Sequence, residues 1–497
     1  MKQWLSTCSC DPQSSTATVF KPTRLIDLGD GTDLDHFTVK SSSEILVPAY
    51  LCLSYCWGGD NNLICARNCF DTLGQWKALV KDAPTTIQHA LIVTRDLGFR
   101  YIWVDSLCIA QDDVAEVERE IKQMSLIYKG ARVTICASSA KSSQAGFLHS
   151  RLESSEQKFR LKTSCGGYGT IYLDRYLWSR PPIAEPLSTR AWAFQERYLS
   201  PRVLEYGWKT ARWSCLCQQG YSGNQHLSIP YSDPKGPTRS LEYNMHSYLN
   251  PYGVRTLCQS REDLFQSWVF IVKEYSSLKM THPEDRLRAI SGVAQELYRV
   301  TKVSYLAGLW DHERLPSLLQ WRVECSPTEL LPRPKLDRAP SWSWAAIDNA
   351  VSIRSSKDVV MPFKIIQVQI HNEFGVVAHG SIKLQGPIRS GAWWPDAAVV
   401  AVGNDFSGVE KIKNPGEALI VWPDCADEIA TVAEKCIRPM SIDLTFLAVG
   451  KANWNETDIR GLLLKRKETG KDFIRMGMFQ APASFVKDWD IGTVVIT

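Results

Sequence analysis

Between Ile45 and Ala137, apolar runs alternate with stretches whose apolar residues recur every three or four positions. The runs, at 45–57, 101–104 and 133–137, have the composition of buried strands. The stretches at 85–97 and 114–128 have the spacing of amphipathic helices. Strand, helix, strand, helix, strand is the order of a parallel sheet with helices packed against it. We therefore expect an α/β fold in this part of the chain.

The strand ends of such a sheet indicate where a ligand would bind. Open parallel sheets bind ligands just beyond the carboxyl ends of their strands. Gly58-Gly59-Asp60 follows the first predicted strand, and Asp105-Ser106 follows the second. These are the places where we expect binding groups.

The length of 497 residues indicates two or three domains. Residues 1–44 are rich in Ser and Thr, which predicts a loosely ordered lead-in. Residues 70–80 have apolar side chains at helical spacing, which predicts a further helix. We expect the α/β domain over 45–220, a helical region over 263–340 and a β-rich part over 341–497, where short alternating runs such as 363–370 and 382–385 occur.

Composition argues against several classes of protein. A net charge of +4 gives no electrostatic reason to expect a nucleic-acid partner. No signal-like segment and no stretch of about 20 apolar residues is visible, so we expect a cytoplasmic protein without a membrane partner. The 15 cysteines are then expected to be reduced, and their spacing does not favour a metal site. No GxGxxG, Walker, HExxH or GxSxG pattern is present.

Three blocks together resemble the HET domain of fungal heterokaryon incompatibility proteins. They are Leu53–Gly58 (LSYCWG), Leu97–Asp113 (with YIWVDSLCIAQDD at 101–113) and Thr189–Arg202 (TRAWAFQERYLSPR). Their order and spacing match the family over about residues 45–220. Segments 305–310 and 339–345 also resemble stretches found after this domain in long HET proteins. Cys56 departs from the pattern, where a small or β-branched residue is usual.

The resemblance implies a role in nonself recognition between fungal hyphae, with the domain triggering programmed cell death. HET domains have been compared with Toll/interleukin-receptor (TIR) domains, which are flavodoxin-like α/β units, and some of these cleave NAD. The resemblance thus implies a TIR-like fold and NAD as a substrate, while it implies no bound cofactor. Fold alone does not establish activity.

Glu196 is the predicted catalytic residue. In TIR enzymes a catalytic Glu follows a Trp by four positions on a helix, and Trp192 and Glu196 have this spacing. A carboxylate there would stabilise a cationic sugar in the transition state. The alternative is a structural cluster of ion pairs among Glu196 and the arginines Arg190, Arg197 and Arg202.

Six further residues are predicted to bind a ligand. They are Ser54, Trp57, Gly58, Asp105, Gln111 and Arg190. Asp105 closes a strand at the expected ligand edge, and it would serve equally well to cap the next turn. The rings at 55 and 57 could face a nucleotide or pack in the core.

Three functions remain open from the sequence. The first is an incompatibility-type effector or signalling protein of cell death, acting through NAD cleavage. The second is a non-enzymatic regulatory scaffold, and the third is a HET-like protein recruited to a biosynthetic pathway. Protein partners or self-association are expected, and nothing in residues 341–497 names a partner.

Overall fold

The computed structural model describes 21 segments of the chain. These are residues 2–8, 20–45, 49–59, 65–72, 74–149, 157–162, 168–173, 185–208, 211–215, 219–221, 261–325, 329–353, 363–370, 374–375, 377, 379–394, 399–402, 420–425, 442–451, 458–468 and 470–497. The chain divides into two compact units, Met1–Val254 and Arg255–Thr497. None of the helices in the described segments is long and apolar enough to cross a membrane.

The first unit contains a sheet whose described strands lie in the order β11-β10-β9-β6-β3-β5-β1-β2-β4. Its centre is parallel and consists of β3 (Tyr50–Ser54), β5 (Tyr101–Trp103), β6 (Val133–Cys136) and β9 (Arg202–Tyr206). Numbered along the chain, these four strands lie in the order 2-1-3-4, the order of flavodoxin-like sheets. The expected α/β fold with a parallel sheet is thus confirmed.

Antiparallel strands extend this sheet on both sides. One side carries β1 (Arg24–Asp27), β2 (His36–Ser41) and β4 (Trp76–Leu79), and the other carries β10 (Ala211–Cys215) and β11 (Gln219–Tyr221). A separate hairpin pairs β7 (Gln157–Lys162) with β8 (Tyr168–Leu173).

Two expectations differ from this structure. The predicted lead-in contains β1 and β2, which continue the sheet beyond β5 and bury Leu25 and Ile26 completely. The predicted helix over 70–80 is a turn followed by β4, because pairing with β2 satisfies its backbone. Trp76 there packs against Phe37 of β2, with ring centroids 6.4 Å apart.

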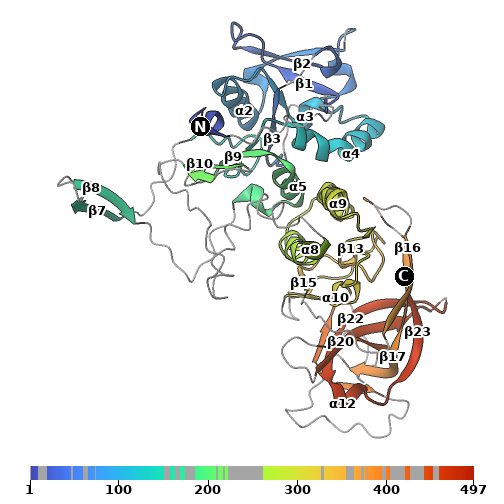
Figure 1. Ribbon diagram of the computed structural model, residues 1–497. Coiled ribbons are helices and arrows are strands. Elements are labelled where there is room, and N and C mark those ends of the chain that lie inside the picture. The colour runs from blue at the N-terminus through green and yellow to red at the C-terminus, as the bar shows by residue number, and fades with distance from the viewer. Residues whose placement is uncertain are drawn as a thin grey trace, which may run out of the picture. The chain divides into compact units, whose positions relative to one another are not determined.

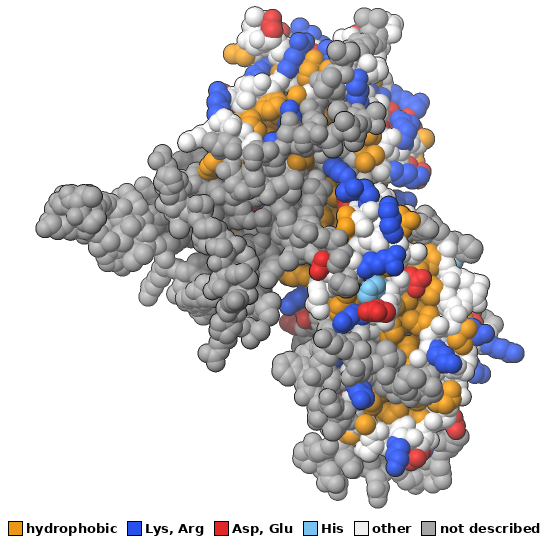
Figure 2. Space-filling model, viewed as in Figure 1, with side chains coloured by type: hydrophobic (Ala, Val, Ile, Leu, Met, Phe, Trp, Pro, Cys, Tyr) orange, Lys and Arg blue, Asp and Glu red, His pale blue; other side chains and the backbone are white. Residues whose placement is uncertain are grey.

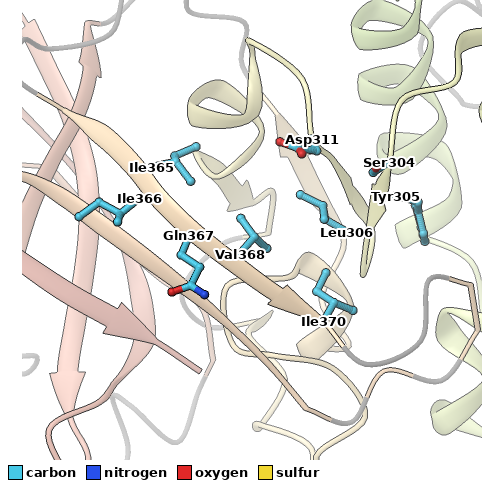
Figure 3. Close-up of a pocket in the computed structure, with 9 residues that line it drawn as sticks. All are labelled: Ser304, Tyr305, Leu306, Asp311, Ile365, Ile366, Gln367, Val368 and Ile370. Carbon is cyan, nitrogen blue, oxygen red and sulfur yellow. The ribbon is translucent and has the colours of Figure 1, made fainter.

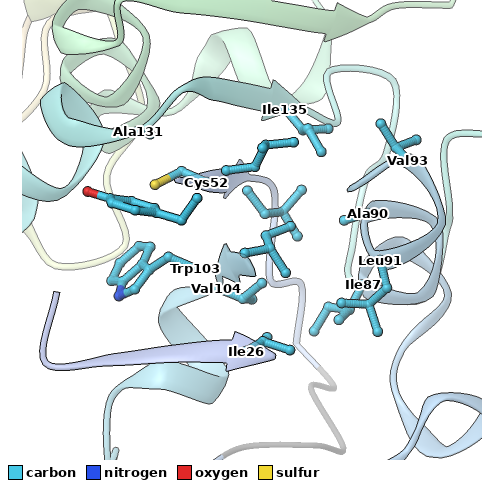
Figure 4. Close-up of a cluster of buried hydrophobic side chains, with 14 of the residues drawn as sticks. Ile26, Cys52, Ile87, Ala90, Leu91, Val93, Trp103, Val104, Ala131 and Ile135 are labelled. Carbon is cyan, nitrogen blue, oxygen red and sulfur yellow. The ribbon is translucent and has the colours of Figure 1, made fainter. Parts of the chain in front are cut away.

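Helices cover both faces of the parallel strands (Figure 1). They are α2 (Thr85–Asp96), α4 (Val114–Gly130) and α5 (Ala191–Leu199), and shorter helices are α1 (Lys2–Thr7) and α3 (Asp105–Cys108). Figure 4 shows Ile87, Ala90 and Leu91 of α2 on one side of the strands and Trp103 on the other. Trp103 contacts Tyr128 of α4 edge to face at 5.7 Å. The apolar residues of alternating strands and helices therefore form one core, as their spacing predicts.

The second unit begins with helices and ends in a sheet (Figure 1). Its first part contains α8 (Arg261–Ser276), α9 (Arg288–Thr301), β12 (Tyr305–Leu306), β13 (Leu309–Trp310), α10 (Leu315–Leu318), β14 (Trp321–Val323) and β15 (Val351–Ile353). The sheet comprises β16 (Lys364–Ile370), β17 (Gly380–Trp394), β18 (Val399–Val402), β19 (Ile420–Pro423), β20 (Ile442–Lys451), β21 (Asp458–Arg466), β22 (Phe473–Pro482) and β23 (Asp490–Ile496), with the short α12 (Ala483–Val486) before β23. The helical middle and β-rich C-terminal part are confirmed.

Many tryptophans of the second unit are core residues. The side chains with virtually no exposure include Trp268, Trp310, Trp321, Trp342 and Trp344. These tryptophans therefore serve the packing of the second unit.

On the face shown in Figure 2, basic, acidic and hydrophobic side chains are interspersed over the described parts of the surface.

Candidate functional site

The sheet of the first unit has a topological switch point between β3 and β6. The chain leaves β3 for β5 on one side, and then crosses back to place β6 on the other side. Loops at the carboxyl ends of β3 and β6 therefore diverge, which opens the position where α/β sheets bind ligands. Ser54, the last residue of β3, pairs there with Cys136 of β6.

Glu196 of α5 reaches this switch point. Only 7 % of the residue is exposed, and the Ser54 hydroxyl donates a hydrogen bond to its carboxyl group. Burial raises the pKa of Glu196 from 4.5 to about 7, and the negative charge of Asp105 acts in the same direction. Ser54 and Arg190 act in the opposite direction because they favour the carboxylate. At neutral pH both the protonated and the ionised form of Glu196 are populated.

Asp105 is the first residue of α3 and is separated from the end of β5 by Val104. Its carboxyl group accepts hydrogen bonds from Trp57 Nε1 at 2.9 Å and from the backbone N–H of Ser106 at 2.7 Å. Burial raises the pKa of Asp105, while these two donors and the charge of Arg190 lower it. The Asp105 carboxyl is therefore held in place by the loop after β3 and by its own turn.

Arg190 immediately precedes α5 and acts on three groups of the site. Its positive charge lowers the pKa of both Glu196 and Asp105. It also acts on the Cys56 thiol, whose pKa is raised by burial and lowered by the charge of Arg190. The structure thus brings Ser54, Trp57, Asp105, Arg190 and Glu196 together from two strand ends and one helix. We call these five residues the carboxyl cluster.

Gln111 and Gly58 shape the loops around this cluster. The Gln111 side-chain amide donates to the carbonyl oxygens of Asp105, at 3.1 Å, and Ile109, at 3.3 Å, so it braces the turn that carries Asp105. Gly58 has φ +74°, and a Cβ atom there would lie 2.5 Å from Cβ of Ser142. A residue other than glycine would therefore force the loop after β3 away from residue 142.

The arginines predicted to form one ion-pair cluster with Glu196 have different partners in the structure. Arg197 donates to Glu205 at 2.7 Å, and Arg202 donates through Nε to the Cys8 sulfur at 3.2 Å. Burial would raise the pKa of Glu205, but Arg197 and Arg212 lower it to about 2. The main ion-pair network on this side of the sheet is therefore centred on Glu205, whereas Glu196 is bonded to Ser54.

Tyr55 belongs to this site, although it is not among the six residues predicted to bind a ligand; its ring was expected either to face a nucleotide or to pack in the core. Its hydroxyl donates to the Ser106 hydroxyl at 2.8 Å and links the loops after β3 and β5. It also favours the ionised form of Asp105 through a hydrogen bond. Its position between Ser54 and Trp57 was the available signal.

No group of three or more His, Cys, Asp or Glu residues suited to a metal ion occurs in the described part of the chain.

A pocket of about 430 Å³ lies in the second unit, between β12 and β16. Figure 3 shows its lining, in which Leu306, Val368 and Ile370 lie alongside the polar Ser304, Asp311 and Gln367. All residues of the carboxyl cluster belong to the first unit.

Taken together, the sheet order and the buried carboxyl groups at the switch point define an α/β domain with a polar site at its carboxyl edge. Residues 50–196 match the family model described as heterokaryon incompatibility protein (HET), so this part of the chain is a HET domain. The match begins at the first residue of β3 and ends at Glu196, and it includes the whole carboxyl cluster. Searches of curated proteins and of solved structures returned no match.

Proposed function

We propose that this chain is a heterokaryon incompatibility-type effector that signals programmed cell death in nonself recognition, and that its HET domain hydrolyses NAD. The HET match supports the first part of the proposal. The second part depends chiefly on one observation: Glu196 is buried at the switch point of the sheet, close enough to Asp105 for the two charges to interact. A buried carboxyl with a strongly raised pKa is typical of functional sites, although structural networks also produce one.

The reaction would break the bond between C1′ of the ribose and the nicotinamide nitrogen. Nicotinamide leaves with the bonding electron pair, positive charge develops on the ribose, and water adds to C1′ and releases a proton. The Glu196 carboxylate would stabilise this charge in surroundings poor in water, where electrostatic interactions are strong. Asp105, held by Trp57 and Ser106, would hydrogen-bond ribose hydroxyls, and the charge of Arg190 would favour the ionised form of both carboxyl groups.

The proposal predicts nicotinamide release by the purified full-length protein incubated with NAD, measured by chromatography. Glu196→Gln keeps the shape of the side chain and removes its charge, so we expect the rate to fall at least about 100-fold. The matched control is Glu118→Gln, since Glu118 is exposed on α4. Equal rates for Glu196→Gln and wild type, or no release by either at high protein concentration, would refute the catalytic role.

A regulatory scaffold is the second candidate. The contact between Ser54 and Glu196 also fastens α5 to β3, which is a structural role in itself. Inducible expression in a fungal host separates the two functions. Loss of killing in the Glu196→Gln strain supports the enzyme, whereas retained killing supports the scaffold. Healthy growth on high expression of the wild type would contradict the effector role in either form.

A further inference from the structure

Two cysteines far apart in the sequence meet beside β10. Cys8 follows α1, Cys215 is the last residue of β10, and their sulfur atoms lie 3.4 Å apart across a separation of 207 positions. Neither cysteine forms a disulfide in the structure. Because the sulfur atoms of a disulfide lie about 2.05 Å apart, an approach of roughly 1.4 Å would allow a bond to form.

The surroundings of this pair suit thiol chemistry. Cys8 is half-buried, whereas Cys215 is only 2 % exposed. The Nε–H of Arg202, which lies opposite Cys215 in the sheet, donates to the Cys8 sulfur at 3.2 Å. This hydrogen bond holds the Cys8 sulfur beside Cys215. Cys8 is thus the accessible attacking thiol, and Cys215 is placed to resolve the intermediate.

The element that carries Cys8 depends on such contacts. Helix α1 has six residues, fewer than a helix needs to be stable by itself in water. Its Trp4 stacks on Trp213 of β10, with ring centroids 6.3 Å apart and an interplanar angle of 29°. The packing of α1 against β10 therefore involves the same strand that supplies Cys215.

We propose that Cys8 and Cys215 form a reversible disulfide that fastens α1 to β10 under oxidising conditions. The Cys8 thiolate attacks a disulfide oxidant such as oxidised glutathione, which releases one glutathione thiolate and leaves a mixed disulfide. Cys215, losing its proton to solvent, then attacks the Cys8 sulfur and displaces the second glutathione. Two electrons pass from the cysteines to the glutathione disulfide, and both released thiolates take up protons.

The disulfide would act away from the carboxyl cluster. Cys215 pairs with Arg202, the first residue of β9, so it lies at the amino end of the parallel strands. Ser54 lies at the opposite, carboxyl end. The proposed disulfide is therefore independent of NAD hydrolysis. Its formation links α1 covalently to β10 under oxidising conditions.

Peptide mapping under non-reducing conditions tests this proposal. The full-length protein is equilibrated with mixtures of reduced and oxidised glutathione and digested, and the peptides are analysed by mass spectrometry. We expect a peptide joining Cys8 to Cys215 that disappears on reduction and is absent from Cys8→Ser and Cys215→Ser. It should persist in the control Cys325→Ser, since Cys325 is a half-buried thiol of the second unit.

Thermal unfolding shows whether the disulfide stabilises the first unit. A bond that closes so long a loop should raise the Tm of the first unit by about 5 °C in the oxidised wild type. The two serine variants should show no such rise. Linkage of Cys8 to a different cysteine, stable glutathione adducts without the Cys8–Cys215 peptide, or a linked protein with an unchanged Tm would overturn the proposal.

Discussion

Glu196 is a residue whose burial opposes folding. Its pKa in the folded protein is about 7, compared with an ordinary value of 4.5, so the folded state binds its proton more tightly than the unfolded chain does. Stability is therefore unaffected by this group below pH 4.5, falls as pH rises from 4.5 to 7, and stays reduced above pH 7. Such a cost is common where a side chain is retained for activity rather than for stability.

Glu196→Gln should consequently be more stable than wild type at alkaline pH. The difference between their free energies of unfolding should grow between pH 4.5 and 7 and reach up to about 3 kcal/mol at pH 8. Urea unfolding at several pH values measures it, with Glu118→Gln as the control. A difference that does not change with pH would show that Glu196 ionises normally in the folded protein.

Much of the site could be predicted from single residues, and some could not. Ser54 and Asp105 were expected at this edge because strand ends in a parallel sheet meet there. Glu196 was selected because the resemblance to TIR enzymes gives meaning to its spacing from Trp192, and its catalytic role stays a prediction. The bond from Trp57 to Asp105 and the bracing role of Gln111 depend on how loops fold back. The proximity of Cys8 and Cys215 could not be predicted, because no local sequence pattern encodes a contact between distant segments.

At the scale of elements, periodicity predicted the helices better than the flanking strands. Helix α2 buries an apolar face whose spacing is visible in the sequence. The spacing also predicts the buried Met124, Ile127 and Tyr128 of α4, but Val114 of its expected apolar face is exposed. Strands β1, β2 and β4 lie at the side of the sheet, where pairing between segments fixes the backbone. In β4 this pairing with β2 outweighed an apolar spacing that favours a helix.

The start of α4 offers a test at this scale. The Asp113 carboxylate caps the helix by accepting hydrogen bonds from the backbone N–H groups of Ala115 and Glu116. Asp113→Ala should lower the free energy of unfolding of the first unit by about 1 kcal/mol, since both groups lose their acceptor. The control Glu118→Ala changes an exposed side chain on the same helix. Equal stability of the two variants in urea would contradict the capping role.

At the scale of the molecule, each unit has a core of its own. The second unit also buries an ion pair, in which Arg475 Nε donates to Asp424 at 3.0 Å and its guanidinium lies 3.3 Å from the centre of the Trp321 ring. Burial raises the pKa of Asp424, while the charge of Arg475 lowers it. If Arg475 were removed, Asp424 would therefore remain as a buried charge that has lost its ion-pair partner.

Arg475→Ala should therefore destabilise the second unit by about 3–5 kcal/mol. In calorimetry of the full-length protein, we expect the transition of the second unit to move to lower temperature while that of the first unit keeps its Tm. Lys465→Ala, at an exposed position on β21, is the matched control. A parallel shift of both transitions would show that the two units unfold as one.

Strand β17 has a consequence for how the chain is made in the cell. Its residues Ile382–Ile388 pair with β23, so that Ile382 lies opposite Ile496. The ribosome delivers the chain from its amino end, and domains generally fold as units in that order. The HET domain can therefore fold while synthesis continues, whereas residues 382–388 of β17 keep one edge unpaired until 490–496 have been synthesised and have left the ribosome. During this interval the nascent second unit exposes a strand edge suited to chaperone binding.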